Sequence, residues 1–245
     1  MTLDEILASL FPGGHDVGVD DAGLISGSGP FEDGRASVIG VANRAPLGVE
    51  GAAKLAGKVM AVIVAGRKDP LLVLVDSDSQ RMSKRDEMLG LSEYLAHLSK
   101  CLILADMRGI PTIGLLYGHT AAGAFIATAL STRILVALPG ADPEVMDLPS
   151  MSRVTKLSID VLKEKAKSTP VFAPGLENLA QTGAVLESWD SQKSLAAQLS
   201  ALLARAAETG DRRDVLGEAR GGRPKAAEIS SRVQELARGE AGGGA

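Results

Sequence analysis

A run of small residues around one histidine is the stretch of this chain best suited to chemistry. Residues 117–124 read Tyr-Gly-His-Thr-Ala-Ala-Gly-Ala and join an apolar run to an alanine-rich helical stretch. The first N–H groups of a helix lack intrahelical acceptors, and small side chains let an anion approach them to roughly 3 Å. The sequence therefore predicts an oxyanion site here, although the same residues would also permit close packing alone. The candidate catalytic residues are Gly118, His119, Thr120, Ala121, Ala122 and Gly123.

A second polar loop, Asp76–Lys84, follows the apolar run 71–75. In parallel α/β sheets, loops at the carboxyl ends of the strands commonly contact ligands. We therefore expect Ser79, Gln80 and Arg81 to bind substrate next to the first loop. The basic side chains of this segment could pair with a carboxylate or a phosphate, or could form a solvated loop face.

His119 could donate a proton or a hydrogen bond, because imidazole titrates near neutral pH. His97 and Cys101 have the i, i+4 spacing of a metal pair, but two ligands without a third or fourth favour ordinary packing. A nucleophilic serine working with His119 would stand at the helix start, where Ala121 and Ala122 stand instead. The sequence thus predicts neither a metal site nor a covalent serine mechanism.

Strands alternate with helices through the middle of the chain and would position these loops. The expected strands are 23–25, 37–42, 71–75, 112–117 and 133–137, and the expected helices are 49–65, 85–107 and 121–130. This alternation indicates a parallel sheet, with a tight turn at 118–120. At the start of the chain, Thr2 and Glu5 have capping-box spacing and predict a helix over 2–11.

The last hundred residues are mainly helical. Helices are expected at 157–167, 175–181, 191–208 and 224–238, with one short strand at 184–187 and a disordered tail at 239–245. We expect three parts: a helix and irregular arm over 1–34, a globular domain over 35–210, and a helix with a flexible tail over 211–245.

Composition excludes several classes of function. The 245 residues carry a net charge of −4 without a basic excess, which argues against nucleic-acid binding. A single cysteine allows no disulfide framework and favours a cytoplasmic setting. We expect no export signal or membrane span, because the start is acidic and the apolar runs are short. Aromatic residues make up 3%, which disfavours stacking of a flat cofactor.

Several motifs resemble the carboxyltransferases of the acyl-CoA carboxylase type. The run 74–77, Leu-Val-Asp-Ser, stands where those enzymes have Val-Asp-Thr-Pro-Gly, and Glu87 and Gly90 match a Glu and a Gly on the next helix. The turn 118–123 matches Gly-x-Gly-Gly-Ser-Gly, and Arg133 falls on the matching Arg-Val-Leu strand. Within this crotonase-like group, the chain is most similar to the gamma subunit of biotin-independent malonate decarboxylase.

The resemblance implies an α/β crotonase-like fold, a spiral of β-β-α units over 35–210 with a helical C-terminal region. It implies that the chain pairs with a homologous beta subunit to release CO2 from a malonyl thioester through an enolate, leaving acetyl-carrier protein. The substrate would ride on the phosphopantetheine-like, dephospho-CoA-derived arm of an acyl carrier protein, the delta subunit. An alpha acyl-carrier-protein transferase subunit is the other implied partner. No intrinsic cofactor and no metal are implied.

The chain also departs from the family pattern. Thr120, Ala121 and Ala122 replace the glycine-rich turn, residues 83–85 read Ser-Lys-Arg instead of Gly-Ile-Gly, and His119 stands where Glu is common. Two alternatives therefore remain open. The chain could be a non-catalytic scaffold that completes the site of the beta subunit, or a subunit of a biotin-dependent acyl-CoA carboxyltransferase.

Overall fold

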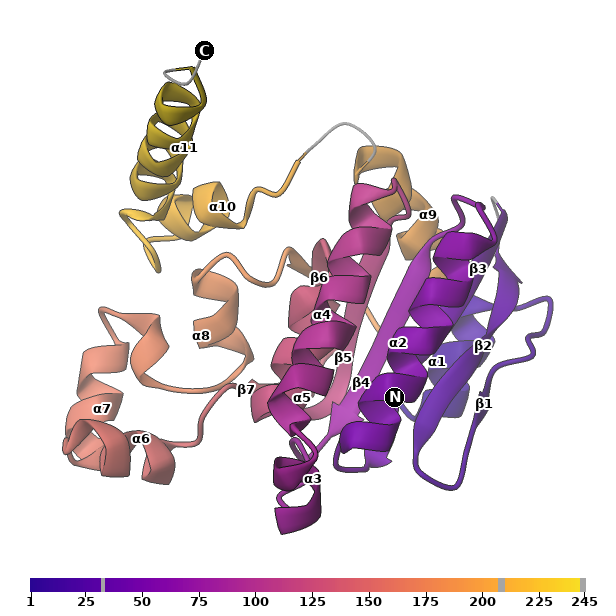
Figure 1. Cartoon of the computed structure of the whole chain (residues 1–245), viewed down its shortest axis with the longest axis horizontal. Helices are drawn as coiled ribbons and strands as arrows, with labels where there is room; N and C mark the ends of the chain where they lie inside the picture. Colours follow the sequence, from indigo (N-terminus) through magenta and orange to yellow (C-terminus); the bar gives the residue numbers. More distant parts are fainter. Residues whose placement is uncertain (32–33, 207–209, 243–245) are drawn as a thin grey trace. The chain divides into compact units, whose positions relative to one another are not determined.

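The computed structural model describes residues 1–31, 34–206 and 210–242 (Figure 1). The chain forms two compact units. The first comprises Met1–Met146 and Glu187–Thr209, and the second comprises Asp147–Leu186 and Gly210–Ala245. No helix in the described part of the chain is both long and apolar enough to cross a membrane. The division at 34/35 and 210/211 that the sequence suggests stays a prediction.

A mixed sheet forms the centre of the first unit, with strand order β1-β2-β3-β4-β5-β6-β8 and β7 beside β5. The antiparallel part is β1 (Gly18–Val19), β2 (Leu24–Phe31) and β3 (Gly34–Arg44). β4 pairs with β3 in parallel, and the strands beyond it also run parallel to their neighbours. The parallel strands are β4 (Leu71–Ser77), β5 (Thr112–Ala121), β6 (Ile134–Ala137), β7 (Asp142–Glu144) and β8 (Glu187–Ser188). Residues 71–75 of β4 are all buried, as expected of a strand covered on both faces.

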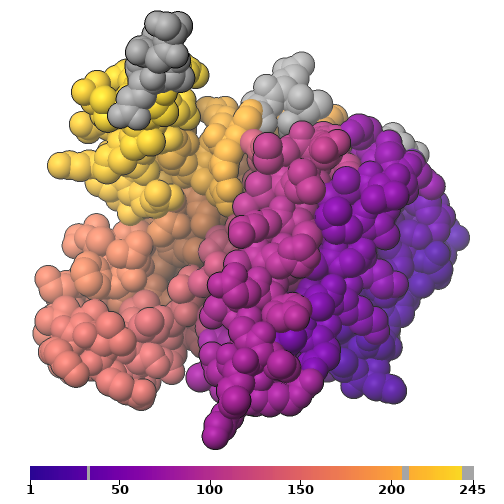
Figure 2. Space-filling view, viewed as in Figure 1, coloured from indigo at the N-terminus to yellow at the C-terminus, as the bar shows by residue number. Residues whose placement is uncertain are grey.

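Helices cover the sheet of the first unit. Their bounds are α1 (Leu3–Leu10), α2 (Val49–Val64), α3 (Lys84–Met88), α4 (Leu91–Met107), α5 (Ala122–Ala127) and α9 (Leu195–Ala206), with a 3-10 turn at Ala129–Ser131. α2 and α4 pack side by side over one face, and their atoms form a continuous surface in Figure 2. α1 packs against α9.

The second unit is helical. It contains α6 (Leu148–Thr155), α7 (Ile159–Ala166), a 3-10 turn (Pro170–Phe172), α8 (Leu176–Gln181), α10 (Arg213–Ala219) and α11 (Ala226–Gly242). Asp147 and Ser158 cap α6 and α7 by accepting backbone N–H groups of the first turn. The guanidinium of Arg220 donates to the carbonyls of Ala180, Val185 and Leu186, so it joins the end of α10 to the segment after α8.

Local structure matches the sequence in some places and corrects it in others. The capping box of α1 is present, with the Thr2 hydroxyl accepting from Glu5 N and the Glu5 carboxylate accepting from Thr2 N. The helix expected over 85–107 is two helices, because Gly90 adopts φ +81° between α3 and α4. The turn expected at 118–120 belongs to β5, which continues to Ala121 because β7 pairs with its end.

The other differences concern the ends of elements. β2 extends to Phe31, beyond the strand expected at 23–25, because it pairs along its length with β3. The helix expected at 121–130 ends at Ala127. The short β7 and the helix α6 have no counterpart among the expected elements. Of the tail predicted to be disordered, α11 includes positions up to Gly242, and 243–245 lie outside the described residues.

Candidate functional site

The two candidate loops lie side by side at the carboxyl ends of β4 and β5. Ser77 of β4 pairs with Thr120 of β5, and beyond this pair the N–H of Gly123 donates to Oε1 of Gln80 at 2.8 Å. Leu47 holds the loop 76–84 in place, since its N–H donates to the carbonyl of Ser79 at 2.9 Å. Sequence and structure therefore agree that these loops are neighbours, whereas the chemical roles assigned to their residues stay predictions.

Asp76 organises the backbone where the strands end. Its carboxylate accepts from His119 N at 3.1 Å and from Arg44 N at 3.3 Å, so it links the ends of β3, β4 and β5. Gly118 leaves room for this carboxylate, because a Cβ at 118 would lie 2.6 Å from Asp76 Cγ. The signal for this residue in the sequence is a carboxylate directly after the five apolar residues 71–75.

Tyr117 precedes this glycine and has a buried hydroxyl. Among the described residues the hydroxyl has no hydrogen-bond partner. Burial, followed by the negative charge of Asp76, raises the pKa of Tyr117 well above its usual range. The phenol therefore stays protonated next to the Asp76 carboxylate at neutral pH.

The His119 imidazole lies between two carboxylates of β7. Its Nδ1 is 3.2 Å from Asp142 Oδ2, and its Nε2 is 3.7 Å from Glu144 Oε1. The parallel register brings the three together, because His119 pairs with Asp142, and Ala121 pairs with Glu144. The His119 side chain is 15% exposed. Sequence reasoning missed both carboxylates because a three-residue strand leaves no periodic pattern.

The predicted oxyanion donors differ in their surroundings. Thr120 is buried, pairs with strands on both sides, and donates its hydroxyl to the Val75 carbonyl at 3.2 Å, so its side chain belongs to the core. Ala121 is buried at the N-cap of α5. Ala122 adopts φ +49°, a left-handed conformation that costs a non-glycine residue about 1–2 kcal/mol. The turn is therefore held in an uncommon shape by the strands around it.

The three predicted substrate-binding side chains do not point to one place. Gln80 reaches Gly123, whereas the Ser79 hydroxyl donates to the carbonyl of Gln80 at 2.8 Å. Arg81 lies against the start of α2, where its Nη1 is 4.0 Å from Glu50 Oε2. Of these residues, only Gln80 has a side-chain contact with the turn 118–123 among the described interactions.

Asp86 fixes the loop 76–84 to α2. Its carboxylate is buried and accepts from Val49 N at 2.9 Å and from the Ser83 hydroxyl. The Ser83 hydroxyl, followed by the Val49 N–H, lowers the pKa of Asp86, so the carboxylate stays ionised and the loop stays attached at neutral pH. The basic cluster of this loop also has a structural role, because Arg85 pairs with Glu50 at 2.5 Å.

Two further pairs of residues could do chemistry by their type, His97 with Cys101 as metal ligands and Ser131 with Ser152 as nucleophiles. Cys101 Sγ is 3.7 Å from His97 Nε2, and burial raises the pKa of the thiol. Within the described ranges, no group of three or more His, Cys, Asp or Glu residues is placed to hold a metal ion. Ser131 donates its hydroxyl to the carbonyl of Ile126, and Ser152 lies in the second unit.

Comparison with known proteins places the chain in a family. Residues 42–237 match the model of the malonate decarboxylase gamma subunit. The malonyl-S-ACP:biotin-protein carboxyltransferase MADD of Malonomonas rubra is 30% identical over 196 residues, 72% of this chain and 67% of its own length. These matches support a role in a decarboxylating or carboxyl-transferring enzyme complex.

Solved structures give the same result. A Pseudomonas malonate decarboxylase hetero-tetramer in complex with coenzyme A contains a chain that is 26% identical, with a TM-score of 0.74 over 96% of this chain and 98% of that one. Transcarboxylase 12S, at 16% identity and a TM-score of 0.65 over 84% of this chain and 40% of that one, shares the fold. The crotonase-like α/β fold predicted from the sequence is thereby confirmed. With four fifths of its residues inside the matched range, the chain belongs to the malonate decarboxylase gamma subunit family.

Proposed function

We propose that this chain binds the reacting end of a malonyl thioester between Gln80 and the turn 118–123 and helps to release CO2. It does so paired with a homologous beta subunit, and an acyl carrier protein delivers the thioester on its phosphopantetheine-like arm. The observation that carries the proposal is the 2.8 Å hydrogen bond from Gly123 N to Gln80 Oε1 at adjoining strand ends. The amide oxygen of Gln80 thus occupies the place where a substrate oxyanion could accept a hydrogen bond from the Gly123 N–H.

The reaction makes a clear demand on such a donor. When the bond to the carboxylate breaks, its electron pair moves into the thioester and leaves an enolate oxygen. A pre-aimed N–H that meets this oxygen lowers the barrier, and removing one such donor from an enzyme costs about 10²–10³ in kcat. Gln80 must withdraw for an anion to bind. The anion that this subunit holds is either the enolate oxygen or the reacting carboxylate.

The enolate carbon then needs a proton, and we assign its delivery to His119. The imidazole is held by Asp142 and is mostly buried, and the more exposed Asp142 carboxylate connects it to solvent. A second carboxylate, that of Glu144, faces the other ring nitrogen, with its Oε1 3.7 Å from Nε2. Loss of a general acid typically costs 10²–10⁴ in rate.

The experiment measures CO2 release from malonyl-carrier protein by this chain alone, by its beta-like partner alone, and by the two mixed in equal amounts. Activity in the mixture alone supports a shared site. The variant G123A places a methyl group 2.9 Å from Gln80 Oε1, in the space proposed for the anion, and should lower kcat/KM at least about tenfold. Full activity of G123A in an intact complex would refute the site.

A matched pair tests the histidine separately. H119Q should lower kcat about 100-fold or more, whereas H97Q, which changes an exposed histidine of α4, should leave it unchanged. Equal rates for the two variants would exclude His119 as the proton donor. Assembly of both is checked by size-exclusion chromatography, so that loss of the complex is not mistaken for loss of chemistry.

Carboxyl transfer is the second candidate, because the Malonomonas relative is named as a carboxyltransferase that acts between malonyl-S-ACP and a biotin protein. The same bond breaks in both reactions, but in transfer the carboxyl group goes to biotin instead of leaving as CO2. Adding avidin to the assembled complex separates the two. Avidin-insensitive CO2 release supports decarboxylation, and inhibition by avidin supports transfer.

A further inference from the structure

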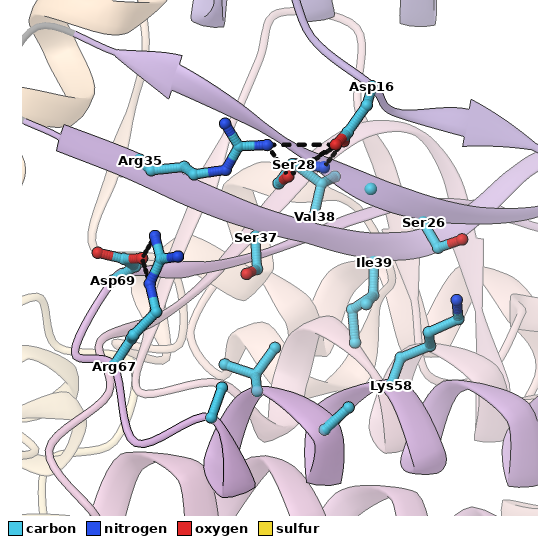
Figure 3. A pocket seen from close by; sticks show the side chains of 14 residues that line it. Asp16, Ser26, Ser28, Arg35, Ser37, Val38, Ile39, Lys58, Arg67 and Asp69 are labelled. Carbon is cyan, nitrogen blue, oxygen red and sulfur yellow. Dashed lines mark hydrogen bonds and ion pairs between the residues drawn. The ribbon is translucent and has the colours of Figure 1, made fainter.

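Figure 3 shows a groove of about 630 Å³. It lies at the end of the sheet opposite the candidate site. Its walls come from β2, β3, the second half of α2 and the turn before β4. Ser37 in the groove is seven residues before Arg44 at the far end of β3, a separation of roughly 23 Å along the strand. The groove is therefore a different place from the one assigned to the thioester.

The groove exists because the face of the sheet becomes polar where α2 moves away from it. Near its start α2 lies close to the sheet, since a Cβ at Gly51 would be 3.4 Å from Leu24 Cδ2. Farther along, α2 lines the groove with the short side chains of Ala61 and Ala65. Opposite them, β2 and β3 present serines, with Ser28 paired to Ser37. Small helix residues facing hydroxyls leave an open, polar space.

Two arginines at one side of the groove are held in fixed orientations. The Arg35 guanidinium donates through Nη2 to Asp16 at 3.2 Å and to the Ser28 hydroxyl. Arg67 donates through Nε to Asp69 at 2.7 Å. A guanidinium has five N–H donors, so each arginine keeps further donors that its carboxylate has already oriented. Such donors suit the oxygens of a phosphate.

The other side of the groove carries donors without partners. Lys58 has no ion pair among the residues that the structure describes, unlike Lys54 one turn earlier, which pairs with Asp20. The hydroxyls of Ser26 and Ser37 likewise make no hydrogen bond to the described part of the chain. Figure 3 shows Lys58 and Ser26 across the groove from Arg35 and Arg67. Three basic and two acidic residues give the lining one net positive charge.

We propose that this groove binds a small phosphate monoester with several hydroxyl groups, of the sugar-phosphate class. Arg35 and Arg67 take the phosphate, while Lys58, the serines and the carboxylates of Asp16 and Asp69 take the hydroxyls. The Ile39 side chain, which is buried on the same face of β3 as Ser37, forms an apolar floor against the carbon skeleton. The volume suits a small organic molecule and exceeds what an inorganic ion needs. No aromatic residue lines the groove, so a stacked nucleobase finds no platform.

The test is calorimetric titration of the full-length chain with ribose 5-phosphate, ribose and inorganic phosphate. Two matched pairs of exposed α2 residues separate the groove from general charge. K58A removes the unpaired cation of the groove, and its control K54A removes a cation outside the groove. A61E adds a negative charge within the groove, and its control A53E adds a negative charge outside the groove. Circular dichroism and thermal melting check that all four variants fold.

Ribose 5-phosphate should bind the wild type more tightly than phosphate or ribose. K58A and A61E should weaken its binding about tenfold or more, with K54A and A53E unchanged. The proposal fails if ribose 5-phosphate does not bind, if inorganic phosphate binds equally well, or if the controls lose as much affinity as the groove variants. Because the readout is binding, it is independent of the decarboxylation proposed above.

Discussion

Replacing Gly118 with alanine tests how Asp76 supports the candidate site. The new methyl group would clash with the Asp76 carboxylate, since an ideal Cβ lies 2.6 Å from Asp76 Cγ and 2.9 Å from Asp76 Cβ. Asp76 must then turn away from the His119 N–H, which it now accepts at 3.1 Å. The Asp76 side chain cannot keep its present position, because its Oδ1, Cγ and Cβ atoms all lie within 2.9 Å of the new Cβ.

The expected cost follows from the bond that is lost. A hydrogen bond to a charged group contributes about 1.5–3 kcal/mol, and the smaller backbone entropy of alanine offsets about 0.5–1 kcal/mol of this. G118A should therefore destabilise the unit that contains the sheet by roughly 1–2 kcal/mol. For a unit of this size, that lowers Tm by about 2–8 °C.

Gly57 provides the control, because it lies inside α2 and a Cβ there would meet nothing within 4 Å. G57A should be stabilising by about 0.5–1 kcal/mol, so the two glycine variants are expected to differ in sign. Differential scanning calorimetry measures both, and the CO2 assay should show a loss for G118A alone. A Tm for G118A at or above that of the wild type would refute the anchoring role of Asp76.

Three further predictions follow. A122G removes a left-handed non-glycine residue and should be stabilising by up to about 1 kcal/mol in urea titration; no gain would mean that the turn is unstrained. G40A would drive a Cβ into the Leu74 carbonyl and should cost about 3 kcal/mol or more, seen as a lower urea midpoint, whereas an unchanged midpoint would contradict the close strand contact. The hydrogen bond from the Ser28 N–H is the main cause that lowers the pKa of Asp16 in the folded chain. The stabilisation that the ionised Asp16 contributes is therefore present above its unfolded pKa of 3.8 and is lost as the pH falls through the lower pKa of the folded chain. The protection factor of the Ser28 N–H in hydrogen exchange, that is, its slowing relative to an unfolded chain at the same pH, should therefore fall in acid, and D16N should abolish this pH dependence of protection.

Features set by nearby residues were predictable from the sequence. Thr2 and Glu5 form their capping box within one turn, and the length of the apolar run 71–75 favours a strand buried on both faces over a helix. The break at Gly90 was not predictable in the same way. Apolar residues continue at helical spacing on both sides of it, and one glycine does not reveal whether it will adopt a left-handed conformation.

The candidate site was predictable as loops but not as contacts. Placing loops at the carboxyl ends of β4 and β5 follows from the alternation of strands and helices, and it brought Gln80 near Gly123. The partners of His119 depend on β7, whose three residues pair with β5 only after the chain has turned back. Such a pairing depends on tertiary structure and cannot be read from local sequence. The two hydrogen bonds that Asp76 accepts from backbone N–H groups depend on tertiary structure in the same way.

The packing of α1 on α9 has a consequence for how the chain is made. Ser9 in α1 accepts the N–H of Leu195 at the start of α9, a contact between residues 186 positions apart. Closing such a loop in an unfolded chain costs about 4–5 kcal/mol of entropy, beyond a constant term. During synthesis on a ribosome, the apolar face of α1, with Ile6, Leu7 and Leu10, must wait until α9 has been made. In the nascent chain this face therefore stays exposed well after α1 has formed, and it is a natural binding site for chaperones.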